Sequence, residues 1–128
     1  MTELLRKVSA LVVALLVSLS PVMAKDLGIY QTSDRKMDFQ LVTCGGDDLC
    51  VRLLAARGTA KTKQVKPYIG KLVVNRAKAA GKNVWNGVMR FGQYDLNGTL
   101  TLRPGRSFKI AGCVYFVVCD DITLIPAR

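Results

Sequence analysis

Hydrophobic and polar residues alternate along most of the chain. At residues 37–41 the apolar side chains hold the odd positions, and at 85–91 Trp85, Met89 and Phe91 share one face. A period of two is typical of strands that bury one face. The pattern predicts about seven or eight strands, from the runs at residues 27–32, 37–41, 51–55, 69–74, 85–91, 99–103, 107–110 and 122–125.

Turn-forming residues separate these runs. They are Ser33-Asp34-Arg35, Gly45-Gly46, Asn97-Gly98 and Pro104-Gly105. Only residues 75–82 have a helical pattern, which Gly81 would end after about two turns. Short antiparallel strands joined by tight turns favour a closed barrel, because closure removes the exposed edges of a sheet. The sequence therefore predicts an all-β fold, a small antiparallel β-barrel in a single domain.

The first residues have the pattern of a targeting segment. They contain basic Arg6 and Lys7, an apolar run at 8–19, Pro21 and the small-residue pattern Val22-x-Ala24. This arrangement is typical of a secretory signal peptide. A membrane anchor would need about 20 apolar residues, more than this run contains. We therefore expect a signal peptide at 1–24 and one exported domain at 25–128.

Export changes the interpretation of the four cysteines. Cys44 and Cys50, like Cys113 and Cys119, are separated by five residues. In an oxidising compartment an even number of cysteines in a short chain predicts disulfides. A zinc site is disfavoured because the spacing is wrong and the chain has no His. No metal ligand and no cofactor is predicted.

Four cysteines allow three pairings. A Cys44–Cys50 bond is easy to form, because residues 45–48 are strong turn formers. Cys113 and Cys119 enclose an apolar run, and in one straight strand their Cα atoms would be about 20 Å apart, too far for a disulfide. Either the chain reverses there without turn residues, or the bonds cross between hairpins. The repeated spacing favours the two local bonds.

Catalytic combinations are scarce. Without His there is no Ser-His-Asp or Cys-His arrangement, and the chain beyond residue 24 has no Glu. The candidate acid pairs are Asp47-Asp48 and Asp120-Asp121. Adjacent residues in a strand point to opposite faces, and both pairs lie beside Cys in predicted turns, where Asp ordinarily caps backbone groups. The sequence favours a binding protein over an enzyme.

The predicted domain is strongly basic. Removing Glu3, Arg6 and Lys7 from the 19 basic and 9 acidic residues leaves 17 and 8, a net charge of +9. Residues 49–94 contain ten basic residues and no acid. Among them Arg57, Lys61, Lys63 and Lys66 are the candidate binding residues, in or beside an exposed loop predicted at 58–67.

Two interpretations of this loop stay open. Its lysines either keep the protein soluble or form a surface for an anionic lipid, an acidic glycan or an envelope protein. Nucleic acid is disfavoured, because the basic stretch lacks the interleaved aromatic residues that stack on bases.

The aromatic side chains are expected in the core. Tyr30, Phe39, Trp85, Phe91 and Phe108 all lie in alternating runs. If the barrel held a cavity, Trp85 would be the candidate to line it and to contact a small apolar ligand.

Four motifs resemble a known family. Gly28-x-Tyr30-x-Thr32, TCGGDDLCVRL, VWNGVM and GCVYFVVCDD are similar, in that order, to the pattern of the exported bacterial family called domain of unknown function 2147. The first cysteine motif is the most specific. Tyr30 stands where the family usually has Trp, and Val51 replaces a Gly. The resemblance implies a periplasmic, calycin-like β-barrel without an assigned activity.

Together these features predict a disulfide-stabilised binding or interaction module. One hypothesis is a lipocalin-like carrier of a small apolar ligand, and the other is a cationic adaptor for anionic envelope components. A hydrolase is a third class. A roomy apolar interior would favour the carrier, whereas a filled interior and a one-sided basic surface would favour the adaptor.

Overall fold

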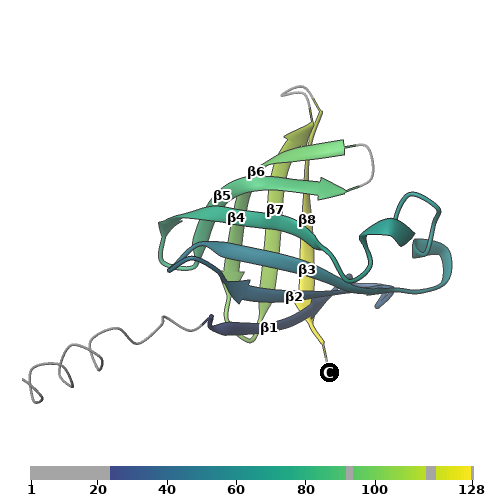
Figure 1. Cartoon of the computed structure of the whole chain (residues 1–128), viewed down its shortest axis with the longest axis horizontal. Helices are drawn as coiled ribbons and strands as arrows, with labels where there is room; N and C mark the ends of the chain where they lie inside the picture. The colour runs from purple at the N-terminus through teal and green to yellow at the C-terminus, as the bar shows by residue number, and fades with distance from the viewer. Residues whose placement is uncertain (1–23, 92–93, 115–117, 128) are drawn as a thin grey trace, which may run out of the picture.

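The chain forms a closed antiparallel barrel of eight strands in a computed structural model that describes residues 24–91, 94–114 and 118–127 (Figure 1). The all-β prediction is confirmed, whereas the predicted signal peptide lies almost wholly outside the described residues. Each strand pairs with the next, and β1 pairs with β8. The strands are β1 (Asp26–Gln31), β2 (Met37–Thr43), β3 (Leu49–Ala56), β4 (Leu72–Gly81), β5 (Val84–Phe91), β6 (Tyr94–Arg103), β7 (Ser107–Val114) and β8 (Val118–Pro126).

The long β3–β4 connection contains two 3-10 turns, η1 (Gly58–Ala60) and η2 (Lys66–Tyr68). No helix among the described residues has the length and apolar character needed to cross a bilayer. Because consecutive strands run in opposite directions, the β1–β2 and β3–β4 connections leave one end of the barrel. The β2–β3, β4–β5 and β6–β7 turns leave the other.

Apolar side chains fill the barrel interior. The largest fully buried ones are Phe108, Leu41, Leu49, Leu53 and Leu124. Burial of each such side chain contributes about 1.5–3 kcal/mol.

The aromatic residues behave as predicted wherever their side chains are described. Tyr30, Phe39, Trp85 and Phe108 are buried, and the side chain of Phe91 lies outside the described part. The ring centroids of Tyr30 and Phe108 are 6.3 Å apart.

The helix predicted at residues 75–82 is wrong, because residues 75–81 belong to β4 and Lys82 lies in the turn that follows it. Val51 pairs with Val74 and Leu49 with Ala77, so β4 carries one extra residue between these two pairs. This is a β-bulge, and Arg76 within it has a φ of 60°. The extra residue buries Val74 and Ala77 three positions apart, a spacing that imitates a helix.

The turn predicted at Asn97-Gly98 is also wrong, because both residues lie inside β6. Gly98 pairs with Gly87 on β5 and with Gly112 on β7. A Cβ atom on Gly98 would overlap the carbonyl oxygen of Ala111 and lie 2.5 Å from the Cα of Gly112. Glycine is needed here for the close approach of two strands, rather than for a turn.

Both local disulfides are present. Cys44 pairs with Cys50 across the β2–β3 turn, and Cys113 pairs with Cys119 across β7 and β8, with Cα atoms 3.9 Å apart. Strands β7 and β8 are therefore antiparallel neighbours, although the sequence between Cys113 and Cys119 contains no turn-forming residue. As a consequence Asp120 and Asp121 lie inside β8, and the prediction that they occupy a turn is wrong.

Candidate functional site

The β3–β4 loop is the largest irregular segment of the barrel, and it projects from one end (Figure 1). Its backbone is fixed to β3, since the amide of Gly70 donates to Leu53 O at 2.6 Å and the amide of Leu53 donates to Lys71 O at 3.0 Å. Val65 is buried in the core, and Tyr68 and Ile69 pack against it. The loop is therefore anchored to the barrel by its backbone and by its apolar side chains.

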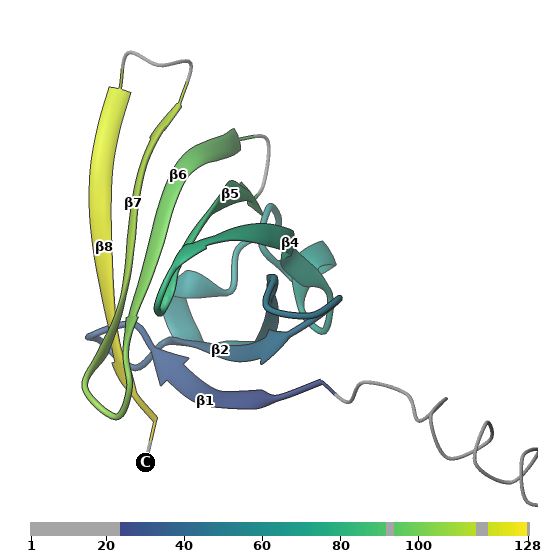
Figure 2. The same cartoon turned by 90° about the vertical axis from the view of Figure 1, so that its left-hand side faces the viewer.

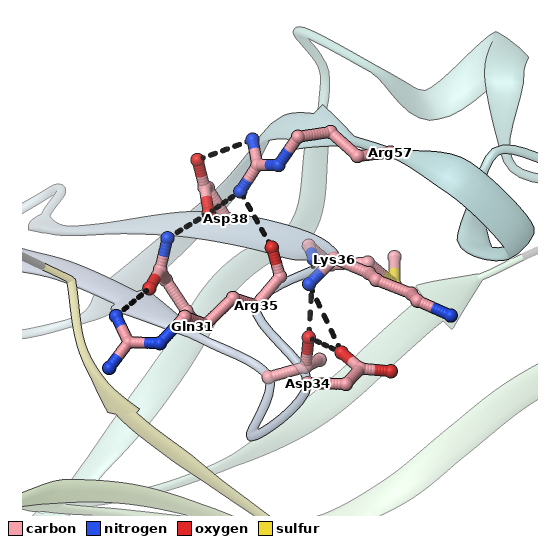
Figure 3. Close-up of polar contacts among 8 residues, drawn as sticks. Gln31, Asp34, Arg35, Lys36, Asp38 and Arg57 are labelled. Atoms are coloured by element: carbon pink, nitrogen blue, oxygen red, sulfur yellow. Dashed lines mark hydrogen bonds and ion pairs between the residues drawn. The ribbon is translucent and has the colours of Figure 1, made fainter.

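Arg57 connects this loop to the β1–β2 turn (Figure 3). Its guanidinium donates to both carboxylate oxygens of Asp38, at 2.6 Å and 3.0 Å, and to the carbonyl oxygen of Arg35 at 2.9 Å. The backbone amide of Arg57 donates to Lys36 O at 2.8 Å. The Lys36 ammonium donates to the hydroxyl of Thr59. Two connections that are distant in sequence thus lie side by side.

Hydrogen bonds shift the pKa values of both acids near this contact. The hydrogen bond from Arg57 lowers the pKa of Asp38, and a weaker hydrogen bond from Gln31 acts in the same direction. The hydroxyl of Thr32 and the amide of Lys36 lower the pKa of Asp34. Asp38 correspondingly raises the pKa of Arg57. Both carboxylates are therefore ionised at neutral pH and engaged by local partners.

The lysines of the loop remain available to solvent. Lys61, Lys63 and Lys66 are exposed, and no acidic side chain in the described parts of the chain lies within ion-pair distance of them. Seven basic residues, which we call the cationic rim, come from the two adjacent connections. They are Arg35, Lys36, Arg57, Lys61, Lys63, Lys66 and Lys71.

The sequence-predicted candidates divide into two groups. Lys61, Lys63 and Lys66 share the β3–β4 loop with Arg57, whose guanidinium is engaged by Asp38. Trp85 lies elsewhere, since the residue is buried in the core and only 5% exposed. Its indole N–H donates to the carbonyl oxygen of Asp47 at 2.7 Å, which ties the β2–β3 turn to β5.

The sequence analysis missed the contribution of the β1–β2 turn. The signal for this turn in the sequence is the pair of adjacent basic residues, Arg35 and Lys36. Nothing in the local pattern indicates that they contact the β3–β4 loop, because this contact depends on barrel closure. Val65 was also missed, since it is an isolated apolar residue within a polar stretch.

Asp48 and Asp121, one from each aspartate pair, form ion pairs with basic residues of neighbouring strands. Asp48 accepts a hydrogen bond from the amide of Ala79 at 3.4 Å and forms ion pairs with Arg76 and Lys78, both at 3.7 Å. Asp121 pairs with Lys109 at 3.4 Å. Over the residues that the structure describes, no three His, Cys, Asp or Glu side chains form a group that could hold a metal ion.

Comparison of the chain with known protein families, curated proteins and solved structures finds no match. The family resemblance therefore stays a prediction that rests on the four motifs. The candidate site is defined by its own geometry: an anchored loop that holds exposed lysines beside a second basic turn.

Proposed function

We propose that the protein is an exported binding module whose cationic rim contacts anionic components of the bacterial envelope. The observation that carries the proposal is the exposure of Lys61, Lys63 and Lys66 on an anchored loop, with no acidic partner among the residues that the structure describes. A lysine near an anionic membrane surface contributes about 1 kcal/mol to binding. Because the loop backbone is already ordered, little conformational entropy is lost when it binds.

The packing inside the barrel supports the adaptor over the carrier. Phe39, Leu41, Leu53 and Phe108 occupy the interior, and Val65 of the β3–β4 loop is buried in the same apolar cluster. A carrier of an apolar ligand needs a cavity lined by such side chains. Here all four belong to one cluster of buried apolar side chains.

Export is supported by two features. The leader pattern at residues 1–24 is typical of a signal peptide, and two disulfides suit an oxidising compartment. We expect the protein isolated from periplasm to begin at Lys25 and to have no free thiol. N-terminal sequencing and alkylation without reductant test this. A start before residue 20, or four alkylated cysteines, would contradict it.

Vesicle cosedimentation tests the rim. The probe is phosphatidylglycerol vesicles, with phosphatidylcholine vesicles as the neutral reference, at low and high salt. Binding to the anionic vesicles should fall at high salt, because salt screens exposed charges beyond about 8 Å at physiological ionic strength. Replacement of Lys61, Lys63 and Lys66 by Gln should weaken binding up to about 150-fold, from about 1 kcal/mol per lysine.

A matched variant controls for net charge. Lys82 and Arg106 are exposed in turns at the other barrel end, and Arg103 is exposed at the end of β6 beside them. Their replacement by Gln removes the same three charges. This control should bind nearly as well as the wild type. Equal loss of vesicle binding in both variants would show that net charge, and not the rim, determines binding. Absence of binding by the wild type would contradict an anionic-membrane partner.

A further inference from the structure

Strand β8 has one open edge. It pairs with β7 from Val118 to Leu124, but with β1 only at Ile125 and Pro126. In the described part of the chain no strand pairs with the other edge of β8 before Ile125. Figure 2 shows β8 at the border of the sheet, where β7 and β8 extend beyond β1. The barrel is closed by a short seam that leaves most of β8 unpaired on one side.

Exposure along β8 agrees with this arrangement. The five consecutive residues from 119 to 123 are all exposed, whereas a strand inside a closed barrel buries alternate residues. Ile122 is 47% exposed although it has the same inward orientation as buried Leu124. This part of β8 therefore lacks cover on its inner face as well as a neighbour at its edge.

Hydrogen bonds identify the backbone groups that face the open edge. The amide of Ala127 donates to Ile29 O on β1 at 2.9 Å. The backbone N–H and C=O groups of Ala127 therefore point away from β7. Because backbone direction alternates along an antiparallel strand, Cys119, Asp121 and Thr123 also direct their N–H and C=O groups to the open side. Consistently, the amide of Asp121 donates to the side chain of Asp120 at 2.8 Å and not to β7.

The chemistry of this edge differs from that of the rest of the domain. Asp120 and Asp121 are adjacent and exposed in a domain with an excess of basic residues. Ile122 follows them as an exposed apolar side chain. An extended segment that pairs with this edge would place basic residues opposite the two acids and an apolar residue opposite Ile122.

We propose that the β8 edge between Cys119 and Leu124 binds an extended cationic peptide segment of another protein by strand addition. Backbone hydrogen bonds would supply affinity, and the acids would select the partner by charge. A second copy of the chain is a poorer occupant. Pairing two β8 edges would bring four aspartates together between two cationic proteins. The proposal is independent of the cationic rim, which lies on the β1–β2 and β3–β4 connections.

A synthetic peptide provides the probe. Acetylated Thr-Thr-Ile-Lys-Lys-Thr-amide, aligned antiparallel to residues 124–119, places Ile opposite Ile122 and the two Lys opposite Asp121 and Asp120. In amide NMR spectra of the oxidised domain, the Cys119, Asp121 and Thr123 signals should shift with added peptide and exchange more slowly. The same peptide with Asp in place of both Lys should bind at least about tenfold more weakly.

Two controls separate strand addition from charge attraction. A peptide N-methylated at the residues that hydrogen-bond to β8 keeps its charge and should lose binding. On the protein, Asp120→Asn with Asp121→Asn should weaken binding about threefold to tenfold, as expected for exposed ion pairs. Asp95→Asn is the matched control, since the Asp95 and Asp121 side chains are both 61% exposed and ion-paired, and it should bind like the wild type.

Unchanged β8 amide signals at millimolar peptide, or equal binding of the Lys and Asp peptides, would overturn the proposal. Dimers in sedimentation without peptide, lost in the Ile122→Lys variant, would assign the edge to a second copy instead.

Discussion

The guanidinium of Arg57 holds both carboxylate oxygens of Asp38, and this contact joins the start of β2 to the residue that follows β3. The same guanidinium also donates to the carbonyl oxygen of Arg35. Arg57, which sequence reasoning selected as a binding residue, therefore holds the two halves of the cationic rim together.

Acid should weaken this contact. The pKa of Asp38 is lowered from its ordinary value of 3.8, so its stabilising effect is complete above that pH and is lost as the pH falls through the folded-state value. Because the pair is partly exposed, the effect should be about 1 kcal/mol or less. Urea unfolding should show Asp38→Asn less stable than the wild type at pH 7, with the difference closing as the pH falls below the ordinary pKa of 3.8. A constant difference would contradict the linkage.

The ring and the N–H group of Trp85 should make separate contributions to the free energy of unfolding. Trp85→Ala should cost about 3–5 kcal/mol because it leaves a cavity in the core. Trp85→Phe keeps most of the packing but leaves the carbonyl oxygen of Asp47 without this donor, at a cost of about 1 kcal/mol beyond the lost packing. Urea titration measures both. Native fluorescence typical of a water-exposed indole would contradict the burial.

The two disulfides should differ in their contribution. Their loops have equal length, so chain entropy predicts about 2 kcal/mol for each. Cys50 is buried, however, whereas Cys119 is exposed. The double change Cys44→Ala and Cys50→Ala should therefore cost more than Cys113→Ala with Cys119→Ala. Equal melting temperatures for the two variants would show that burial of Cys50 adds nothing.

Gly98 should be among the positions least tolerant of substitution. A Cβ atom there meets the backbone of β7, which cannot move aside as a side chain can, so Gly98→Ala should cost about 3 kcal/mol. Gly46 offers the control. It has a φ of 87° and open space around it, so Gly46→Ala should cost only about 1 kcal/mol through backbone strain. Comparable losses would contradict the role assigned to strand contact at Gly98.

Local sequence patterns were sufficient to predict most of the barrel. Alternation identified the strands, and it identified Trp85 and Phe108 as core residues, because a strand with one buried face must repeat every two residues. The turn residues at 45–48 were likewise enough to suggest the Cys44–Cys50 disulfide. These features depend on neighbours in the chain, which is why a sequence can show them.

Contacts between segments that are distant in sequence decided the features of the fold and of the site that local patterns did not predict. The bulge at Arg76 in β4 and the close approach at Gly98 contradicted local patterns, because each depends on the register of adjacent strands. Lys61, Lys63 and Lys66 could be selected from sequence as an exposed basic group. Their proximity to Arg35 and Lys36 could not, since it requires the β1–β2 turn and the β3–β4 loop to meet at one barrel end. The open edge of β8 likewise follows from the stagger of strands at closure, which has no local sequence signal.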